Sequence, residues 1–176
     1  MIGFDSGIIE QCKKGERKAQ MQMYSTFYKR VYNACYRVLR DQAEAEDAMQ
    51  ESFLKAFSSL NIYSHSVPFE AWLVRIAINT SIDKLRKKDL EVINLNENIY
   101  YEVPDTNDNE EWEEILHKVD KVKKAIEKLP ESSRLIINLY LIEGYDHEEI
   151  ADILNIAPGT ARIQYMRAKQ KLIELI

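Results

Sequence analysis

The chain of 176 residues contains few helix-breaking or cross-linking residues: five glycines, four prolines and two cysteines. No apolar run approaches the roughly 20 residues that span a membrane, and the N-terminus lacks the basic-then-apolar order of a secretion signal. Cys12 and Cys35 are far apart and form no CxxC pair, a pattern that favours two ordinary thiols in a reducing cytoplasm over a disulfide framework. With 45% hydrophobic and 30% charged residues, this composition predicts a soluble, helix-rich, cytoplasmic protein.

The net charge of −5 is unusual for a protein that binds nucleic acid. The segment from Asp89 to Asp120, however, holds eleven acids and one base, Lys118, and so carries −10. The remainder holds 18 acids and 23 bases, a net charge of +5. Because two mildly basic parts flank an acidic connector, the overall charge does not argue against DNA binding.

Apolar residues recur at steps of three and four along most of the chain, which predicts amphipathic helices and an all-α fold. The expected helices are Ser6–Lys14, Glu16–Arg40, Ala43–Leu60, Phe69–Lys88, Glu110–Leu129, Glu131–Glu143, Asp146–Leu154 and one that starts at Pro158. Between Asp89 and Asn109 the periodicity is weak and acids are frequent, which is typical of an extended, flexible linker. The sequence therefore predicts two small helical domains joined by an acidic linker.

The expected helix Ala43–Leu60 has two distinct faces. One is an apolar stripe suited to a core, formed by Ala45, Met49, Phe53, Ala56, Phe57 and Leu60. The other carries an acid, an amide, an acid and a leucine at helical spacing: Asp47, Gln50, Glu51 and Leu54. Such a face could dock on a basic partner helix, with orientation from the carboxylates and contact area from the leucine. Taken alone, it could equally be a solvated helix face.

The loop Asn61–Pro68 and the helix after it carry a pattern suited to single-stranded nucleic acid. A flipped base needs a π surface and an amide, and the strand's backbone needs cations. The residues that would supply them are Tyr63 and His65 in the loop, expected to be exposed, and Asn79, Lys84 and Arg86 on the helix. The alternative is an ordinary basic helix end, which also suits the helix dipole.

The C-terminal stretch predicts a helix-turn-helix. Asp146 with Glu149 three residues later forms a capping-box pattern, and Pro158 suits the first turn of the second helix. The outward face of that second helix would read the edges of base pairs in the major groove. The residues expected there are Thr160, Arg162, Ile163, Met166 and Arg167. Two antiparallel helices with a basic surface remain the alternative.

No constellation of catalytic or metal-binding residues stands out. His65, His117 and His147 are scattered, and there is no glycine-rich phosphate loop. The tetrapeptide that begins at His147, HEEI, lacks the second histidine of a zinc helix. We therefore expect neither an enzyme nor a cofactor, a metal site or a small-molecule substrate.

Three motifs, in order, resemble the sigma-70 family of RNA polymerase sigma factors, of the extracytoplasmic-function (ECF) type. They are AEDAMQESFLKAF, FEAWLVRIAINTSIDKLR and LPESSRLIINLYLIEGYDHEEIADILNIAPGTARIQYMRAKQKL. The resemblance covers nearly the whole chain. It implies a region 2 domain in residues 1–88, a linker in residues 89–110 and a region 4 domain in residues 111–176. The recognition segment GTARIQY departs from the usual GTVKSRL form at Ile163 and Gln164.

The resemblance also implies partners and roles. Asp47, Gln50 and Glu51 match positions that dock on the beta-prime clamp of core polymerase, and region 4 would sit on the beta flap. Tyr63, the loop through Val67 and Asn79 match positions that capture a base of the −10 element. Arg162, Ile163, Met166 and Arg167 match positions that read the −35 element. An anti-sigma factor is a possible further partner. The competing hypothesis is a stand-alone regulator that binds DNA without polymerase.

Overall fold

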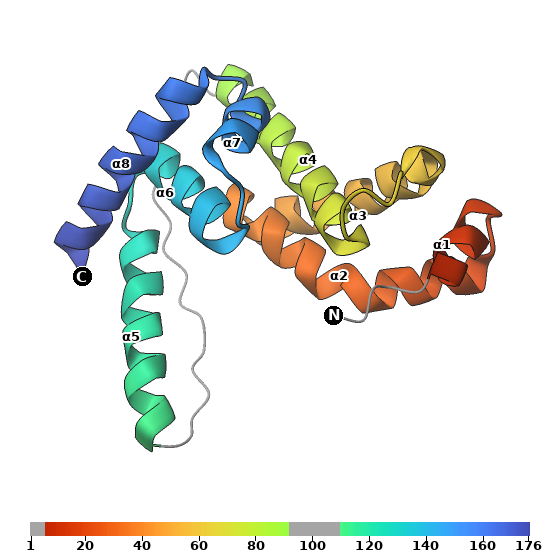
Figure 1. Ribbon diagram of the computed structural model, residues 1–176, viewed down its shortest axis with the longest axis horizontal. Helices are drawn as coiled ribbons and strands as arrows, with labels where there is room; N and C mark the ends of the chain where they lie inside the picture. Colours follow the sequence, from red (N-terminus) through yellow and green to blue (C-terminus); the bar gives the residue numbers. More distant parts are fainter. Residues whose placement is uncertain (1–5, 92–109) are drawn as a thin grey trace. The chain divides into compact units, whose positions relative to one another are not determined.

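The computed structural model describes the backbone of residues 6–91 and 110–176 and the side chains of residues 6–88 and 118–176. Within these ranges the regular structure is helical and contains no strand, so the all-α prediction is confirmed (Figure 1). The α-helices are α1 (Ser6–Lys13), α2 (Arg17–Leu39), α3 (Gln42–Ser59), α4 (Phe69–Glu91), α5 (Glu110–Glu127), α6 (Glu131–Ile137), α7 (His147–Leu154) and α8 (Pro158–Leu175). None of them combines the length and the apolar character needed to cross a membrane.

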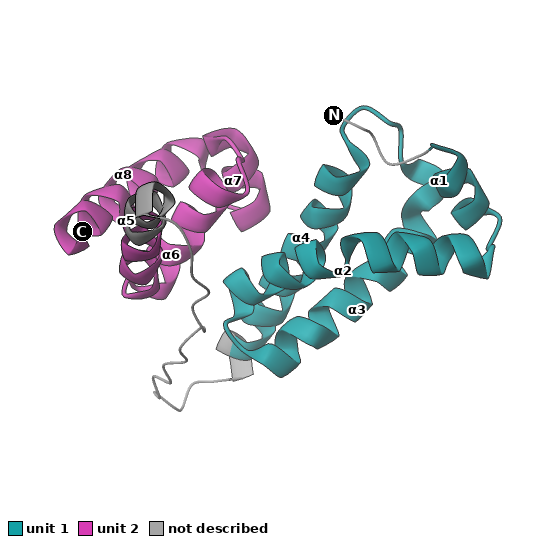
Figure 2. Ribbon diagram, turned by 90° about the horizontal axis from the view of Figure 1, so that it is seen from below, with its two compact units in different colours: residues 1–94 teal, residues 95–176 magenta. Residues whose placement is uncertain are grey.

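The chain divides into two compact units, unit 1 (Met1–Asn94) and unit 2 (Leu95–Ile176) (Figure 2). Helix α4 continues to Glu91, three residues into the expected linker, and α5 begins at Glu110. Residues 92–109, the rest of that linker, lie outside the described residues.

Unit 1 is built from α2, α3 and α4, which pack against one another in all three pairings, with α1 against α2. Its fully buried side chains include Met23 and Val31 from α2 and Leu73 from α4. Asp41 caps the start of α3, where its side chain accepts a hydrogen bond of 2.8 Å from the backbone N–H of Glu44. Such a cap stabilises a helix by about 1 kcal/mol, so it fixes where α3 begins.

Helix α4 is buried on a broader face than its pattern predicts. Helical spacing predicts one buried stripe of six residues: Phe69, Trp72, Leu73, Ile76, Thr80 and Leu85. Of these, Phe69, Leu73 and Thr80 are buried, whereas Trp72, Ile76 and Leu85 are only half-buried. The additional buried residues are Val74, Ala77, Ile78, Ser81 and Ile82. The difference arises because α4 packs against α2 and α3 together, so two of its sides face the core instead of one.

Unit 2 contains the expected helix-turn-helix, formed by α7 and α8. Asp146 and Glu149 complete a capping box at the start of α7, with hydrogen bonds of 2.8 Å and 3.1 Å. The helix ends at Asn155, whose φ of 54° is left-handed, and Ile156 N–H bonds back to the carbonyl of Ala151. Ala161 has no exposed surface, so its small side chain lets α8 approach α7 closely.

The expected helix Glu131–Glu143 is helical but not uniform. After α6 the chain forms a π-helical turn, Asn138–Ile142, and Tyr145 N–H bonds to the carbonyl of Leu139. Gly144, with a φ of 79°, ends this segment in a left-handed conformation that glycine adopts without steric cost. Four residues in succession are buried across the junction of α6 and this turn: Ile136, Ile137, Asn138 and Leu139.

Candidate functional site

The acid–amide–acid–leucine face of α3 points away from the core of unit 1. Leu54 is 70% exposed, and Asp47 and Gln50 are exposed on the same side. The opposite side of α3 is buried through Ala45, Ala48, Met49, Ser52, Phe53 and Ala56. An apolar side chain as exposed as Leu54, set among carboxylates and an amide, is suited to contact with another macromolecule.

Glu51 joins this face to α4. Its Oε1 lies 2.8 Å from Lys55 Nζ, and its Oε2 lies 3.7 Å from Lys84 Nζ. The hydrogen bond from Lys55, with further attraction from Lys55, Lys84 and Lys87, holds the pKa of Glu51 below its usual value. Glu51 is therefore ionised at neutral pH, and its charge is partly balanced before any partner arrives. Sequence reasoning assigned no role to Lys55, although its i,i+4 spacing from Glu51 is a standard signal for such a pair.

The expectation that Tyr63 is exposed is wrong. Its side chain is only 7% exposed, and its ring contacts Phe69 and Trp72 with centroids 5.4 Å and 5.1 Å away. Its hydroxyl donates a hydrogen bond of 2.7 Å to the carbonyl of Val67. The loop is short enough for Tyr63 to fold back onto the start of α4, where burial of the ring is favourable. Tyr63 thus anchors the loop and does not present a free ring face.

His65 is the exposed aromatic residue of the loop. Its ring lies 4.5 Å from that of Tyr63, and its φ of 59° is left-handed. Val67 is 46% exposed and Ile62 79% exposed, so apolar surface surrounds the loop although Tyr63 does not provide it. Ile62 is an exposed residue that sequence reasoning missed, because its place in a 3-10 turn, Leu60–Ile62, breaks the helical spacing.

The expected strand-binding residues of α4 have different environments. Asn79 is exposed. It lies ten residues beyond Phe69, about 15 Å along the helix axis. Lys84 is paired with Glu51, and Arg86 lies 3.9 Å from Asp83. The structure therefore brings Tyr63 and His65 together, separates Asn79 from the helix start by several turns, and connects Lys84 to the α3 face.

The expected base-reading residues are all exposed on α8. Ile163 is 53% exposed and Met166 is 64% exposed. They are flanked by exposed Arg162 and Arg167, while Ala161, Ala168 and Leu172 fix the opposite side of α8 in the core. The face is thus a mixture of guanidinium groups and apolar side chains. The guanidinium groups are suited to contact guanine edges and phosphates, and the apolar side chains are suited to contact thymine methyl groups.

An aromatic cluster packs between the two helices of the helix-turn-helix and the π-helical turn that precedes them. Tyr140 lies with its ring centroid 4.2 Å from that of Tyr165 and 4.9 Å from that of His147. Burial raises the pKa of Tyr165 and keeps its hydroxyl protonated. The cluster spans the π-helical turn, the start of α7 and the middle of α8, so it fixes the orientation of α8.

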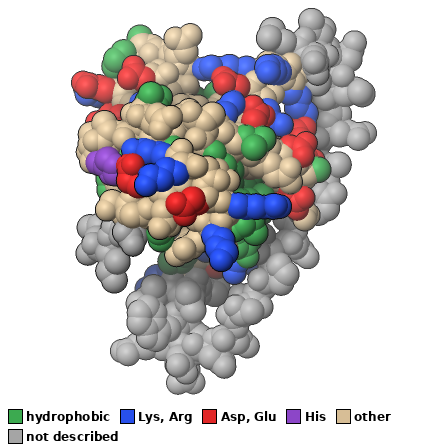
Figure 3. Space-filling view, turned by 90° about the vertical axis from the view of Figure 1, so that its right-hand side faces the viewer, with side chains coloured by type: hydrophobic (Ala, Val, Ile, Leu, Met, Phe, Trp, Pro, Cys, Tyr) green, Lys and Arg blue, Asp and Glu red, His purple; other side chains and the backbone are tan. Residues whose placement is uncertain are grey.

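On the face shown in Figure 3, acidic and basic side chains are interspersed, with isolated apolar side chains between them. Charge of one sign therefore does not cover that whole face.

Comparison with known proteins agrees with this geometry. Residues 23–91 match sigma-70 region 2, and residues 120–172 match sigma-70 region 4. A Bacillus subtilis protein named ECF RNA polymerase sigma factor SigW is 33% identical over 172 residues, which cover 93% of this chain and 92% of the relative. The chain belongs to the family of ECF RNA polymerase sigma factors.

A Haemophilus influenzae relative, the ECF RNA polymerase sigma-E factor, is 30% identical to this sigma factor and covers 96% of it, with 93% of the relative matched. Among solved structures, RpoE of Bartonella quintana in complex with the anti-sigma factor NepR has a TM-score of 0.63 at 23% identity, covering 88% of this chain and 94% of that one. CnrH in complex with the cytosolic domain of CnrY has a TM-score of 0.55 at 23% identity, covering 96% and 94%. At such identities these two structures support the fold alone.

Family membership settles the general role. The sigma factor acts with core RNA polymerase in promoter recognition and transcription initiation, and its family consists of transcription regulators. The two matched regions fall one in each compact unit.

Proposed function

We propose that this sigma factor acts in the cytoplasm without catalytic activity of its own, and that it divides its work between two domains. The domain of residues 1–88 binds core polymerase and captures the −10 element. The domain of residues 111–176 reads the −35 element, and residues 89–110 form the linker that connects the two domains. The observation that carries the proposal is the exposed face of Asp47, Gln50, Glu51 and Leu54 on α3. This face is not required for α3 to pack into the core of unit 1. It also has no role in a regulator that binds DNA without polymerase.

The polymerase-binding step depends on opposite charge. Carboxylates at Asp47 and Glu51 orient a basic partner helix, and the exposed Leu54 adds apolar contact. The natural partner surface is the beta-prime clamp of the polymerase, and the flap of the beta subunit would hold region 4.

The test of the whole proposal is association with core polymerase. Purified sigma factor mixed with bacterial core RNA polymerase is expected to co-elute from a sizing column in the absence of DNA. If it elutes apart from the polymerase yet binds duplex DNA tightly alone, the chain is a stand-alone regulator instead.

Promoter capture in the −10 element would use Asn79 for a base edge, with Lys84 and Arg86 for the strand's phosphates and His65 as the accessible aromatic of the loop. Tyr63 contributes through the loop shape that it anchors. Lys84 can bind a phosphate only by sharing or leaving Glu51, because its Nζ lies 3.7 Å from that carboxylate.

Reading of the −35 element would use the exposed face of α8. We expect Arg162→Ala and Arg167→Ala each to weaken promoter binding by about 1–3 kcal/mol if the side chains contact bases. The measurement is the dissociation constant of the sigma–polymerase complex for promoters with intact and with scrambled −35 elements. A base contact makes the loss larger on the intact element, whereas an equal loss on both would contradict base reading.

A further inference from the structure

Lys55 connects the acid–amide–acid–leucine face of α3 to the neighbouring helix α4. Its Nζ lies 2.8 Å from Oε1 of Glu51, one turn earlier on α3. The same ammonium group donates a hydrogen bond of 3.2 Å to the hydroxyl of Thr80 on α4. Thr80 is only 2% exposed, so its side chain is held in the core and gives Lys55 a fixed point of attachment.

We propose that Lys55 is a positioning residue for polymerase docking: anchored by Thr80, it holds the carboxylate of Glu51 in the orientation that the partner helix requires. The inference rests on the proposed function, which assigns this face of α3 to core polymerase. It adds two residues, Lys55 and Thr80, that act through Glu51 and not by touching the polymerase.

The contact with Lys55 leaves Glu51 able to accept a further hydrogen bond. A carboxylate has two oxygens with about four lone-pair sites. Lys55 binds Oε1, whereas Oε2 lies 3.7 Å from Lys84 Nζ, which is too far for a hydrogen bond. Oε2 can therefore accept from a cation of the partner while Oε1 stays fixed.

Fixing Glu51 before the partner arrives favours binding. A long side chain that becomes immobile only in the interface weakens binding by about two- to tenfold in the dissociation constant. The charge of Lys55 has the opposite effect, because it repels a basic partner. The side chains of Lys55 and Glu51 are 46% and 43% exposed, so water and salt screen this repulsion. The two effects differ in sign, and removal of Lys55 therefore distinguishes them.

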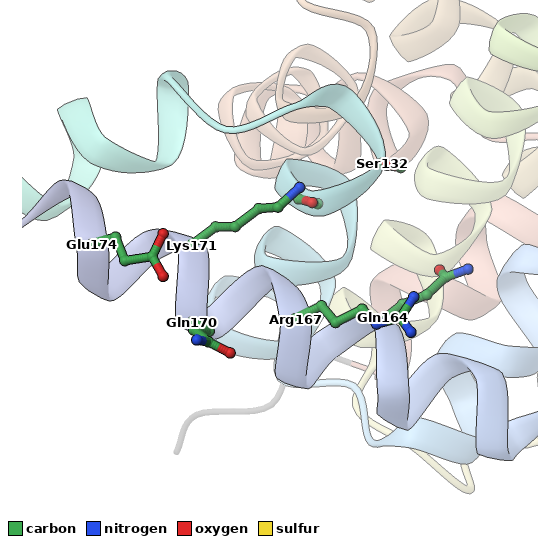
Figure 4. Close-up of a pocket in the computed structure, with 7 residues that line it drawn as sticks. Ser132, Gln164, Arg167, Gln170, Lys171 and Glu174 are labelled. Carbon is green, nitrogen blue, oxygen red and sulfur yellow. The ribbon is translucent and has the colours of Figure 1, made fainter.

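A lysine that reaches toward a neighbouring helix is not by itself a positioning residue. In unit 2 the side chain of Lys171 extends from α8 across a polar groove toward α6, as Figure 4 shows. Lys55 differs because its ammonium group holds a carboxylate that the proposed function assigns to the docking face.

Two substitutions test the positioning role, each made in the full chain and measured as the dissociation constant for core polymerase without DNA. Lys55→Met removes the charge and keeps most of the length, so binding should weaken by about two- to tenfold. Thr80→Val removes a buried hydroxyl that the polymerase cannot reach, and it should weaken binding in the same direction by a smaller factor. In a Glu51→Ala background neither substitution should weaken binding further, because the carboxylate that they position is absent.

Control variants make the result specific. Lys13→Met breaks another lysine–glutamate pair, in which Lys13 Nζ lies 2.7 Å from Glu10 Oε1 on α1, and should leave the affinity unchanged. Thr80→Ser keeps the hydroxyl that Lys55 binds, so it should bind core polymerase like the unaltered chain. A circular dichroism melt of each variant measures whether unit 1 is folded.

The possible outcomes separate the alternatives. Tighter binding by Lys55→Met overturns the proposal, because Lys55 would then act only as a repulsive charge. A loss with Lys55→Met that Thr80→Val does not share also overturns it, because Lys55 would then contact the polymerase directly. A loss that persists in the Glu51→Ala background overturns it as a general effect on the fold. If Glu51→Ala alone leaves binding unchanged, the proposed function of this face fails, and this outcome is distinct from the other three.

Discussion

Replacing Asp47 and Glu51 together by lysine is expected to abolish detectable binding to core RNA polymerase while unit 1 stays folded. The double substitution changes the charge of the α3 face by +4 and turns attraction for a basic partner helix into repulsion, which costs several kcal/mol. Both side chains lie outside the core, so no buried contact is lost. The measurement is co-elution with core polymerase, together with a circular dichroism melt of the free variant.

Two controls distinguish local docking from overall charge. Glu10→Lys with Glu16→Lys makes the same change of +4 at exposed positions near the α1–α2 turn and should leave binding unchanged. Asp47→Asn with Glu51→Gln should give an intermediate loss, since attraction is removed without repulsion. In Glu51→Lys the new lysine faces Lys55 and Lys84, so a modest drop in melting temperature is expected. Full polymerase binding by a folded double-lysine variant would contradict the assignment of this face.

Replacing Tyr63 by alanine is expected to destabilise unit 1 by about 3 kcal/mol and to impair promoter opening. Removal of a buried aromatic side chain leaves a cavity, with costs of about 3–5 kcal/mol for fully buried rings. The ring of Tyr63 packs against Phe69 and Trp72 at the base of the loop, so the loop loses its anchor. Urea unfolding measures the stability, and fluorescence of 2-aminopurine placed in the −10 element measures opening.

The conservative variant separates the ring from the hydroxyl. Tyr63→Phe keeps the packing and loses only the hydrogen bond to the carbonyl of Val67, so about 0.5–1.5 kcal/mol of stability should disappear. Opening should be nearly normal. If Tyr63→Ala retained full stability but lost opening, the ring would act directly on a base, and the anchoring role would be wrong.

The helices and the helix-turn-helix could be predicted from sequence because their signals are local. The capping box at Asp146 and Glu149 and the proline that begins α8 act within a few residues, and both are present as expected. The two faces of α3 were also predictable. Because α3 contacts the core on one side, its apolar residues repeat at the spacing of a helical turn.

The remaining features depend on contacts between distant residues. Tyr63 is buried because the loop folds back onto Phe69 and Trp72. No short-range sequence pattern predicts this folding back of the loop. The burial of Ala77 and Ile78 reflects two neighbouring helices. Likewise, the ion pair between Lys84 and Glu51 joins residues more than 30 positions apart, so periodicity alone could not reveal it.

The two cysteines of the chain both belong to unit 1, at different depths. Cys12 lies on α1, while Cys35 lies near the C-terminal end of α2 with its Sγ 3.9 Å from the carbonyl oxygen of Ala77 on α4. Both are free thiols, and burial raises the pKa of each, which keeps the reactive thiolate scarce. Alkylation of Cys12 therefore requires α1 to separate from α2 and from the 3-10 turn Leu60–Ile62, whereas alkylation of Cys35 requires α2 and α4 to part. The two labelling rates thus measure fraying of the N-terminal helix and global opening of unit 1 separately, whatever unit 2 does.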